Sequence, residues 1–256
     1  MIFETHAHYD DEAFDEDRDE LIPKLLQEGI GTIVNVGASI ASTKTTIALA
    51  EKYPKVYAAA GVHPSDVGEL DEDGYLWLKE QAAHAKVIAI GEIGLDYYWV
   101  KEKEERKRQR YWFARQMELA KECALPVIIH SRDAAEDTLK VMKEVHAKDL
   151  TGVIHCYGYS AELAEAFLDM GYYIGIGGVV TFKNARKLKE TVEKIPLERI
   201  LLETDAPYMA PEPYRGKRND SGKLIFVAEK IAELKGITSE EVETVTWRNA
   251  QALFQL

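Results

Sequence analysis

Six side chains that suit divalent metal ions stand where short apolar runs of the sequence end. Glu92 follows KVIAIG and Asp205 follows RILLET, and the other four are histidines. Imidazole and carboxylate groups are common protein ligands of divalent ions. Six ligands exceed what one zinc ion with an open coordination position requires, so we expect two divalent ions bridged by Glu92. The expected ligands are His6, His8, Glu92, His130, His155 and Asp205.

The His6-Ala7-His8 pair gives only weak evidence when taken alone. Side chains alternate along a strand, so both imidazoles point to the same side. Single histidines are often hydrogen-bonded core or rim residues, however. The argument for a metal site therefore depends on Glu92, His130 and His155 occupying equivalent positions after other apolar runs. The alternative is a dispersed set of polar residues on a rim.

Two further residues are candidates for catalysis beside Asp205. Glu203 precedes Asp205 by two and is expected to face the same interior, one layer deeper. Its buried carboxylate needs a partner, which is either a metal or ligated histidine, or a Lys or Arg of the barrel. His63, in GVHP, is expected to contact the substrate or the leaving oxygen; the alternative is a histidine packed on Pro64.

Two stretches carry cations that could contact an anionic substrate. Arg132 follows His130 by two and could hold a phosphate or carboxylate with both arms of its guanidinium; a surface ion pair with Asp133 or a place at a helix start is the alternative. The run Lys101–Arg110 is interpreted as a solvated helix face.

The loop PYMAPEPYRGKRND mixes basic and aromatic residues. It places Arg215, Lys217 and Arg218 beside Tyr208 and Tyr214. This mixture suits a single strand of nucleic acid, with phosphates on the cations and bases on the rings. Arg215 and Lys217 are the expected substrate contacts, and a flexible solvated loop is the alternative.

Short β-branched runs alternate with amphipathic stretches, which is typical of repeated βα units. Glu104–Ala124 is an example of a helix, because its apolar residues recur at helical spacing. Eight such units favour a single (β/α)8 TIM barrel over residues 1–256, with the two-ion site at its C-terminal mouth. No GxGxxG motif of a doubly wound fold occurs. The predicted strands are Ile2–Thr5, Thr32–Val36, Val56–Gly61, Lys86–Gly91, Pro126–Ile129, Gly152–Ile154, Tyr172–Ile176 and Arg199–Leu202.

Composition narrows the class of protein. The 256 residues are 46% hydrophobic and 30% charged, so the chain can bury a core, and the net charge of −12 argues against a general coat on nucleic acid. We expect a cytoplasmic protein with no membrane span; no protein partner can be inferred. Cys123 and Cys156 are predicted to be reduced and buried, and His84 and His146 to be ordinary helix residues.

Taken in order, seven motifs resemble the TatD family of metal-dependent deoxyribonucleases, within the amidohydrolase-like barrels. They are THAH, GVHP, GEIGLDYY, HSRDA, HCY, ETDAPYMAP and PYRGKRN. The resemblance covers almost the whole chain, from Ile2 to WRNAQALF. It implies the same six metal ligands, a contribution from His63, and Mg²⁺-supported hydrolysis of DNA, commonly from the 3′ end.

The chain departs from the family pattern at two places. Glu4 stands where the family usually has aspartate, which could alter a hydrogen bond under the ligand pair. After RGKRN the family often has an acidic residue and proline, whereas this chain has Asp220 and Ser221. The second change bears on loop geometry more than on chemistry.

The expected reaction is hydrolysis by a water molecule that two divalent ions activate. Mg²⁺ is expected, with Zn²⁺ or Mn²⁺ as alternatives. Asp205 would orient or deprotonate the water with support from Glu203, and His63 would stabilise or protonate the leaving oxygen. Two other functions compete with a DNase: a hydrolase of small amides, lactones or phosphoesters, and a metal- or nucleic-acid-binding protein without catalysis.

Overall fold

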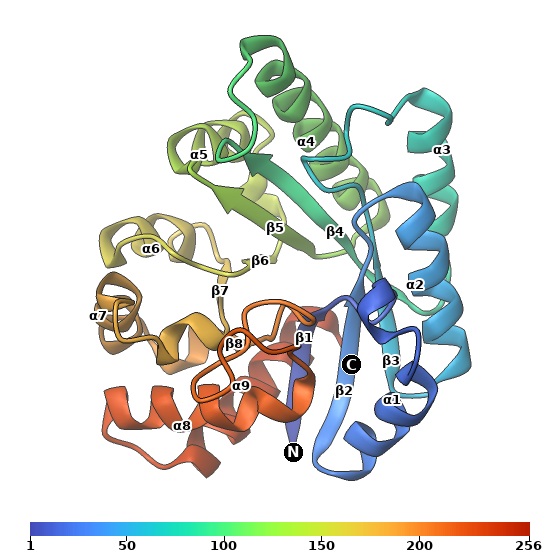
Figure 1. The fold of residues 1–256 in the computed structure, drawn as a ribbon. Helices are drawn as coiled ribbons and strands as arrows, with labels where there is room; N and C mark the ends of the chain where they lie inside the picture. The colour runs from blue at the N-terminus through green and yellow to red at the C-terminus, as the bar shows by residue number, and fades with distance from the viewer.

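Eight parallel strands surround a central axis in chain order, with helices outside them (Figure 1). The computed structural model describes all 256 residues. The isolated bridge Ala7–Ala206 joins the end of β1 to the segment after β8, so the barrel is nearly closed. The predicted TIM barrel is confirmed. The strands are β1 (Ile2–Ala7), β2 (Ile30–Val36), β3 (Val56–Ala60), β4 (Val87–Asp96), β5 (Val127–Arg132), β6 (Gly152–Ile154), β7 (Tyr173–Ile176) and β8 (Ile200–Leu202).

Nine α-helices cover the barrel, and none combines the length and apolar composition needed to cross a bilayer. Several begin at polar caps; the Ser39 hydroxyl, for example, accepts a hydrogen bond from the backbone N–H of Ser42. The helices are α1 (Arg18–Gln27), α2 (Ile40–Lys52), α3 (Glu72–Gln81), α4 (Lys103–Cys123), α5 (Ala135–Glu144), α6 (Ala161–Leu168), α7 (Arg186–Lys194), α8 (Leu224–Lys235) and α9 (Ser239–Phe254).

The apolar core has two parts. One cluster of 60 buried residues includes outward-facing strand residues and the helices packed on them. A second cluster of 12 joins strand residues such as Phe3, Val34 and Leu201 to the last turns of α9. The ring of Phe3 stacks on Phe254 at 5.9 Å. Helix α9 therefore closes the barrel at the N-terminal ends of its strands, which leaves the opposite end for function.

The strand bounds correct the sequence prediction at three places that matter for the site. β1 continues past the predicted end at Thr5 to Ala7, so His6 lies within the strand. β4 continues five residues past the predicted end at Gly91, and β5 continues to Arg132. Glu92 and His130 therefore lie within strands, on backbone held by sheet hydrogen bonds.

α3 and α5 end before His84 and His146, so both histidines lie in turns rather than in helices.

A glycine permits this close pairing of β4 and β5. Gly94 pairs with His130 and has φ +143°, a conformation that L side chains rarely adopt. A Cβ atom at this position would lie 1.9 Å from the carbonyl oxygen of His130. Glycine thus lets the two strands carry Glu92 and His130 side by side.

We expect Gly94→Ala to lower the free energy of unfolding by about 2–4 kcal/mol, through backbone strain and overlap with β5. Chemical denaturation measures this. Gly158→Ala is the matched control, because its added Cβ would meet nothing closer than 4.0 Å. Equal stability of the two variants would contradict the role assigned to Gly94.

Candidate metal centre

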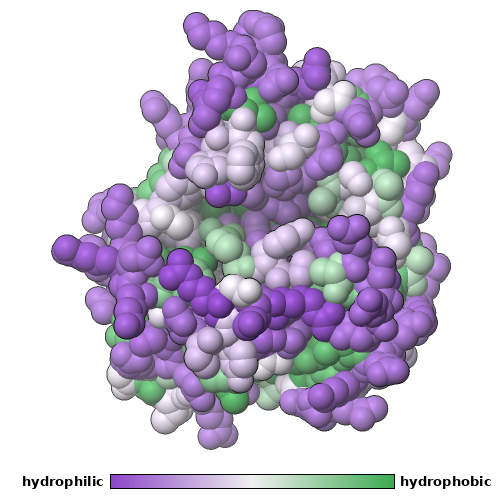
Figure 2. All heavy atoms as spheres, viewed as in Figure 1, coloured by the Kyte–Doolittle hydropathy of each residue, from purple (hydrophilic) through white to green (hydrophobic).

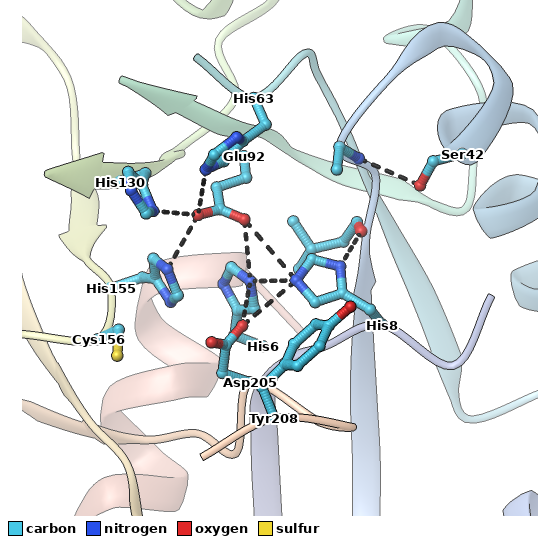
Figure 3. A network of polar contacts seen from close by, with 12 residues as sticks. His6, His8, Ser42, His63, Glu92, His130, His155, Cys156, Asp205 and Tyr208 are labelled. Atoms are coloured by element: carbon cyan, nitrogen blue, oxygen red, sulfur yellow. Dashed lines mark hydrogen bonds and ion pairs between the residues drawn. The ribbon is translucent and has the colours of Figure 1, made fainter. Parts of the chain in front are cut away.

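A cavity of about 950 Å³ opens at the C-terminal ends of the strands. It corresponds to the hollow near the centre of the face in Figure 2. Five of the six predicted ligands line it, and the sixth, His6, lies buried beneath them with 0% exposure. The strands thus bring all six together, as Figure 3 shows for their side chains.

The first group of ligands consists of His6, His8, Glu92 and Asp205. The Nε2 atoms of His6 and His8 lie 3.1 Å apart. Each lies 3.4–3.7 Å from Oε2 of Glu92 and Oδ1 of Asp205. Ligands held at about 2.0–2.2 Å from one ion are separated by about 3.0–3.5 Å. The four atoms therefore have the spacing of a coordination sphere and could hold one divalent ion.

The second group surrounds the other oxygen of Glu92. Its Oε1 lies 2.7 Å from Nδ1 of His130 and 2.9 Å from Nε2 of His155. The two oxygens of one buried carboxylate thus face two different sets of imidazoles (Figure 3). A carboxylate placed in this way could bridge two ions, which is the role predicted for Glu92.

In His8 and in His130, one ring nitrogen contacts an oxygen atom that points away from the candidate ligands. The lone pair of the other nitrogen can then bind a cation. Nδ1 of His8 lies 2.8 Å from the carbonyl oxygen of Val36, so a His8 ring that binds a cation through Nε2 would carry its proton on Nδ1. Nε2 of His130 lies 3.3 Å from Oδ2 of Asp96, so a ring with its proton on Nε2 would offer to a cation Nδ1, the nitrogen that faces Glu92. A hydrogen bond of this kind fixes the tautomer and the orientation of a metal-binding histidine.

The charges of the centre also fit cations. Glu92, Asp205 and Glu203 are largely buried, and each forms ion pairs only with histidines. Burial by itself would raise the pKa of Glu92, but positive charge on His155 and its neighbours lowers that pKa well below the usual value. The site thus contains anions that require protonated imidazoles or metal ions for balance.

The buried polar atoms without hydrogen-bond partners point to the same place. Among buried side-chain nitrogen and oxygen atoms there are three: Nδ1 of His6, Nδ1 of His155 and Oε2 of Glu203. Oε1 of Glu203 accepts a hydrogen bond from the backbone N–H of Cys156 and lies 3.5 Å from Nδ1 of His155. Glu203 therefore lies beneath the ligands with a histidine as its partner; no Lys or Arg pairs with it.

His63 reaches the centre but differs from the ligands. Its Nδ1 accepts a hydrogen bond from the backbone N–H of Ser65, so the neutral ring carries its proton on Nε2. That nitrogen lies 3.7 Å from Oε1 of Glu92. Burial lowers the pKa of His63 to about 4, so the ring is neutral at neutral pH. His63 can thus donate a hydrogen bond into the cavity.

Arg132 lines the cavity, and its side chain forms no hydrogen bond or ion pair within the protein; its guanidinium lies 4.0 Å from the centre of the Tyr98 ring. The alternative, an ion pair between Arg132 and Asp133, is therefore absent from the structure. Arg215 and Lys217 are exposed and lie outside the cavity lining, although Tyr208 of the same loop lines it. Substrate binding by these two cations stays a prediction.

The cysteines differ from expectation, because both are only partly buried. Cys156 lines the cavity, and burial raises the pKa of its thiol to about 12. The thiol is therefore protonated at neutral pH and is a poor metal ligand.

Sequence reasoning missed several residues that position the centre. Gln116 exchanges hydrogen bonds with the backbone of Val62, and Gln109 donates one to the carbonyl of Pro64, so α4 holds the segment that carries His63. Asp96 contacts His130 and was also missed. The even spacing of Glu92 and Asp96 in GEIGLD could have revealed it, because both side chains leave the same side of β4.

Glu4 is fully buried under the His6–His8 pair. It accepts hydrogen bonds from the backbone N–H of His6 and from Thr204 and Ser221, including one of 2.9 Å from the Ser221 hydroxyl. Glu4 and Ser221 are the two departures from the family pattern, and they contact each other. Together they join the end of β1 to the segment after β8.

We expect Asp96→Asn to weaken metal binding and turnover by about 10- to 100-fold, because the asparagine oxygen would be kept by the backbone N–H groups of Tyr98 and Trp99, and the amide N–H left facing His130 Nε2 cannot accept its proton. Metal titration by calorimetry and a hydrolysis assay measure both effects. Asp66→Asn, outside the cavity lining, serves as the control. Unchanged affinity in Asp96→Asn would show that this carboxylate does not orient His130.

Comparisons with known proteins agree with this geometry. The family model described as TatD related DNase matches residues 3–255. The uncharacterized metal-dependent hydrolase YabD of Bacillus subtilis is 45% identical over 256 residues, covering 100% of both chains. The corresponding YcfH of Escherichia coli is 36% identical, over 100% of this chain and 96% of its own. The crystal structure of YjjV, a TatD homologue from E. coli, superposes with a TM-score of 0.93 at 32% identity, covering 100% and 98% of the two chains.

Proposed function

The chain belongs to the TatD related DNase family and is a metal-dependent hydrolase, and from this premise we propose that it hydrolyses phosphodiester bonds of DNA. We further propose that it acts from the 3′ end on single strands or frayed duplex ends. The observation that carries the proposal is a pair of histidine groups joined by Glu92 at the floor of an open cavity, with the unpaired Arg132 at its edge.

Two divalent ions would occupy the two groups of ligands. His6, His8 and Asp205 would hold one, His130 and His155 the other, and Glu92 would contact both. Mg²⁺ is the proposed ion, with Zn²⁺ or Mn²⁺ as alternatives that the histidine-rich ligand set also suits. When bound, such ions make water nucleophilic near neutral pH and offset charge on phosphoryl oxygens.

The chain's own residues would orient the reactants and move protons. Burial by itself would raise the pKa of Asp205, but the hydrogen bond from His8 and the nearby imidazoles lower it, so the carboxylate is ionised. Its side chain is 21% exposed toward the cavity and can accept the proton of the attacking water. Glu203 would support the site from below through His155.

Two residues would act on the phosphodiester itself. His63 is neutral and presents an N–H, so it would stabilise the leaving oxygen by a hydrogen bond rather than by full proton transfer. Arg132 has free donors and would bind a non-bridging phosphate oxygen. The acidic protein, with a net charge of −12, favours an end or a single strand over a long duplex.

Metal-stripped protein restored with Mg²⁺, Mn²⁺ or Zn²⁺ singly tests the proposal on end-labelled single- and double-stranded DNA. We expect a 5′-labelled strand to shorten in steps and a 3′ label to be released first as mononucleotide. Turnover of p-nitrophenyl phosphate or simple lactones without DNA cleavage would instead favour the small-ester hydrolase. DNA binding without cleavage under any ion would favour a binding protein.

A further inference from the structure

Two adjacent aromatic residues stand exposed where β4 leaves the barrel. Tyr98 is 44% exposed and Trp99 is 68% exposed, and Trp99 lines the cavity. Their rings meet edge to face at 4.7 Å. An exposed tryptophan at the edge of a functional cavity leaves a large apolar surface in water, which is typical of a binding surface.

The Arg132 guanidinium completes this cluster. It lies 4.0 Å from the centre of the Tyr98 ring and 5.8 Å from that of Trp99. We call Tyr98, Trp99 and Arg132 the aromatic platform. Its cation has no acidic partner within the protein, so its charge is available to a ligand.

The platform is held in place by backbone contacts rather than left as a loose loop. Oδ1 of Asp96 accepts hydrogen bonds from the backbone N–H groups of Tyr98 (2.9 Å) and Trp99 (3.2 Å). From α4, the Arg106 side chain donates to the carbonyl of Val100. A pre-positioned surface loses little conformational entropy when it binds.

Asp96 also joins the platform to the metal centre. Its other oxygen, Oδ2, lies 3.3 Å from Nε2 of His130. One carboxylate therefore orients both a metal-binding imidazole and the segment that carries Trp99. The platform is thereby held at a fixed position relative to His130.

A second apolar wall faces into the same cavity from the segment after β8. Tyr208 is 54% exposed and Met209 is 43% exposed, and both line the cavity with Trp99. A ligand between these walls needs flat apolar faces together with negative charge for Arg132. An unpaired nucleobase with its phosphate has both properties, and stacking on aromatic rings tolerates any base.

We propose that the aromatic platform binds an unpaired nucleobase of single-stranded DNA and so places the neighbouring phosphodiester over the metal centre. The inference rests on the proposed function and deepens it, because it assigns the preference for unpaired ends to Trp99. A base paired inside a duplex has both faces covered by its neighbours and cannot stack in this way. Arg215 and Lys217, the cations predicted from the sequence to contact the substrate, lie outside the cavity lining, although Tyr208 and Met209 of the same loop belong to it.

The test compares Trp99→Ala with wild type on DNA strands that carry an abasic nucleotide at each terminal position in turn. Anisotropy of a labelled strand in EDTA measures affinity without cleavage, and KM with the active ion gives a second readout. We expect Trp99→Ala to weaken binding about 5- to 100-fold and Trp99→Phe to restore most of it. At one position, the abasic nucleotide should weaken binding to wild type by a similar factor and leave binding to Trp99→Ala almost unchanged.

Tyr111→Ala is the matched control, since this tyrosine is 50% exposed on α4 but does not line the cavity. Equal affinities and KM values for wild type and Trp99→Ala, or the same abasic penalty in both at every position, would overturn the platform. Base-dependent binding through Trp99 without cleavage under any ion would support the platform and refute the DNase. DNA cleavage that Trp99→Ala leaves unchanged would support the DNase and refute the platform. A chain that neither binds nor cleaves DNA would refute both.

Discussion

Replacement of Glu92 by glutamine is expected to abolish metal-dependent hydrolysis while the barrel stays folded. Glutamine has nearly the same shape, so the packing of β4 is kept. A neutral amide, however, cannot offer one anionic oxygen to each of the two histidine groups that Glu92 contacts. Metal ions contribute several kcal/mol to such reactions, so we expect kcat/KM to fall by about 10³-fold or more.

Metal content and activity together test this role. Wild type should bind two ions per chain in mass spectrometry under native conditions, and Glu92→Gln at most one, with unchanged circular dichroism. Glu51→Gln, a carboxylate that contacts His84 away from the cavity, is the control for the loss of one negative charge. A Glu92→Gln variant with wild-type turnover at low metal concentration would rule out the bridging carboxylate.

Asp205→Asn is expected to lower kcat by about 10²- to 10⁴-fold, because the amide can neither accept a proton nor balance the positive charge of the site. The backbone should tolerate this change. Asp205 has φ +57°, a left-handed conformation that asparagine adopts readily and alanine does not. The loss of activity in Asp205→Asn would therefore reflect chemistry rather than folding.

The comparison with Asp205→Ala separates the two effects. Alanine should lose activity to a similar extent and should in addition lower the free energy of unfolding, relative to asparagine, by about 1 kcal/mol or more. Steady-state kinetics and thermal melts of both variants provide the measurement. An Asp205→Asn variant with a tenth or more of wild-type kcat would exclude proton acceptance by this carboxylate.

The six candidate ligands were accessible from the sequence because of the geometry of parallel barrels. His155 and Asp205 each follow a short apolar strand, and the C-terminal ends of all strands meet at one mouth. Alternation along the chain likewise placed Glu203 near Asp205. These predictions need only the order of the strands and the alternation of side chains along each strand. Both can be inferred from short stretches of sequence.

Other parts of the centre depend on contacts between distant segments. Asp96, Gln109 and Trp99 gain their roles from the way α4 packs beside β4, and no local pattern marks them as a group. The predicted cations Arg215 and Lys217 belong to a loop whose path is set by packing; that path places Tyr208 and Met209 in the cavity lining and the two cations outside it. Sequence periodicity says nothing about such a path.

The sequence by itself determined the barrel, the set of ligand types and the end of the barrel at which they meet, since each follows from the local alternation of apolar and polar residues. Only the tertiary structure decided which oxygen of Glu92 faces which histidines, which nitrogens of His8 and His130 face the centre, and that Trp99 rather than Arg215 or Lys217 borders the cavity. Those features depend on side-chain rotamers and loop packing, which are set by neighbours from other parts of the chain.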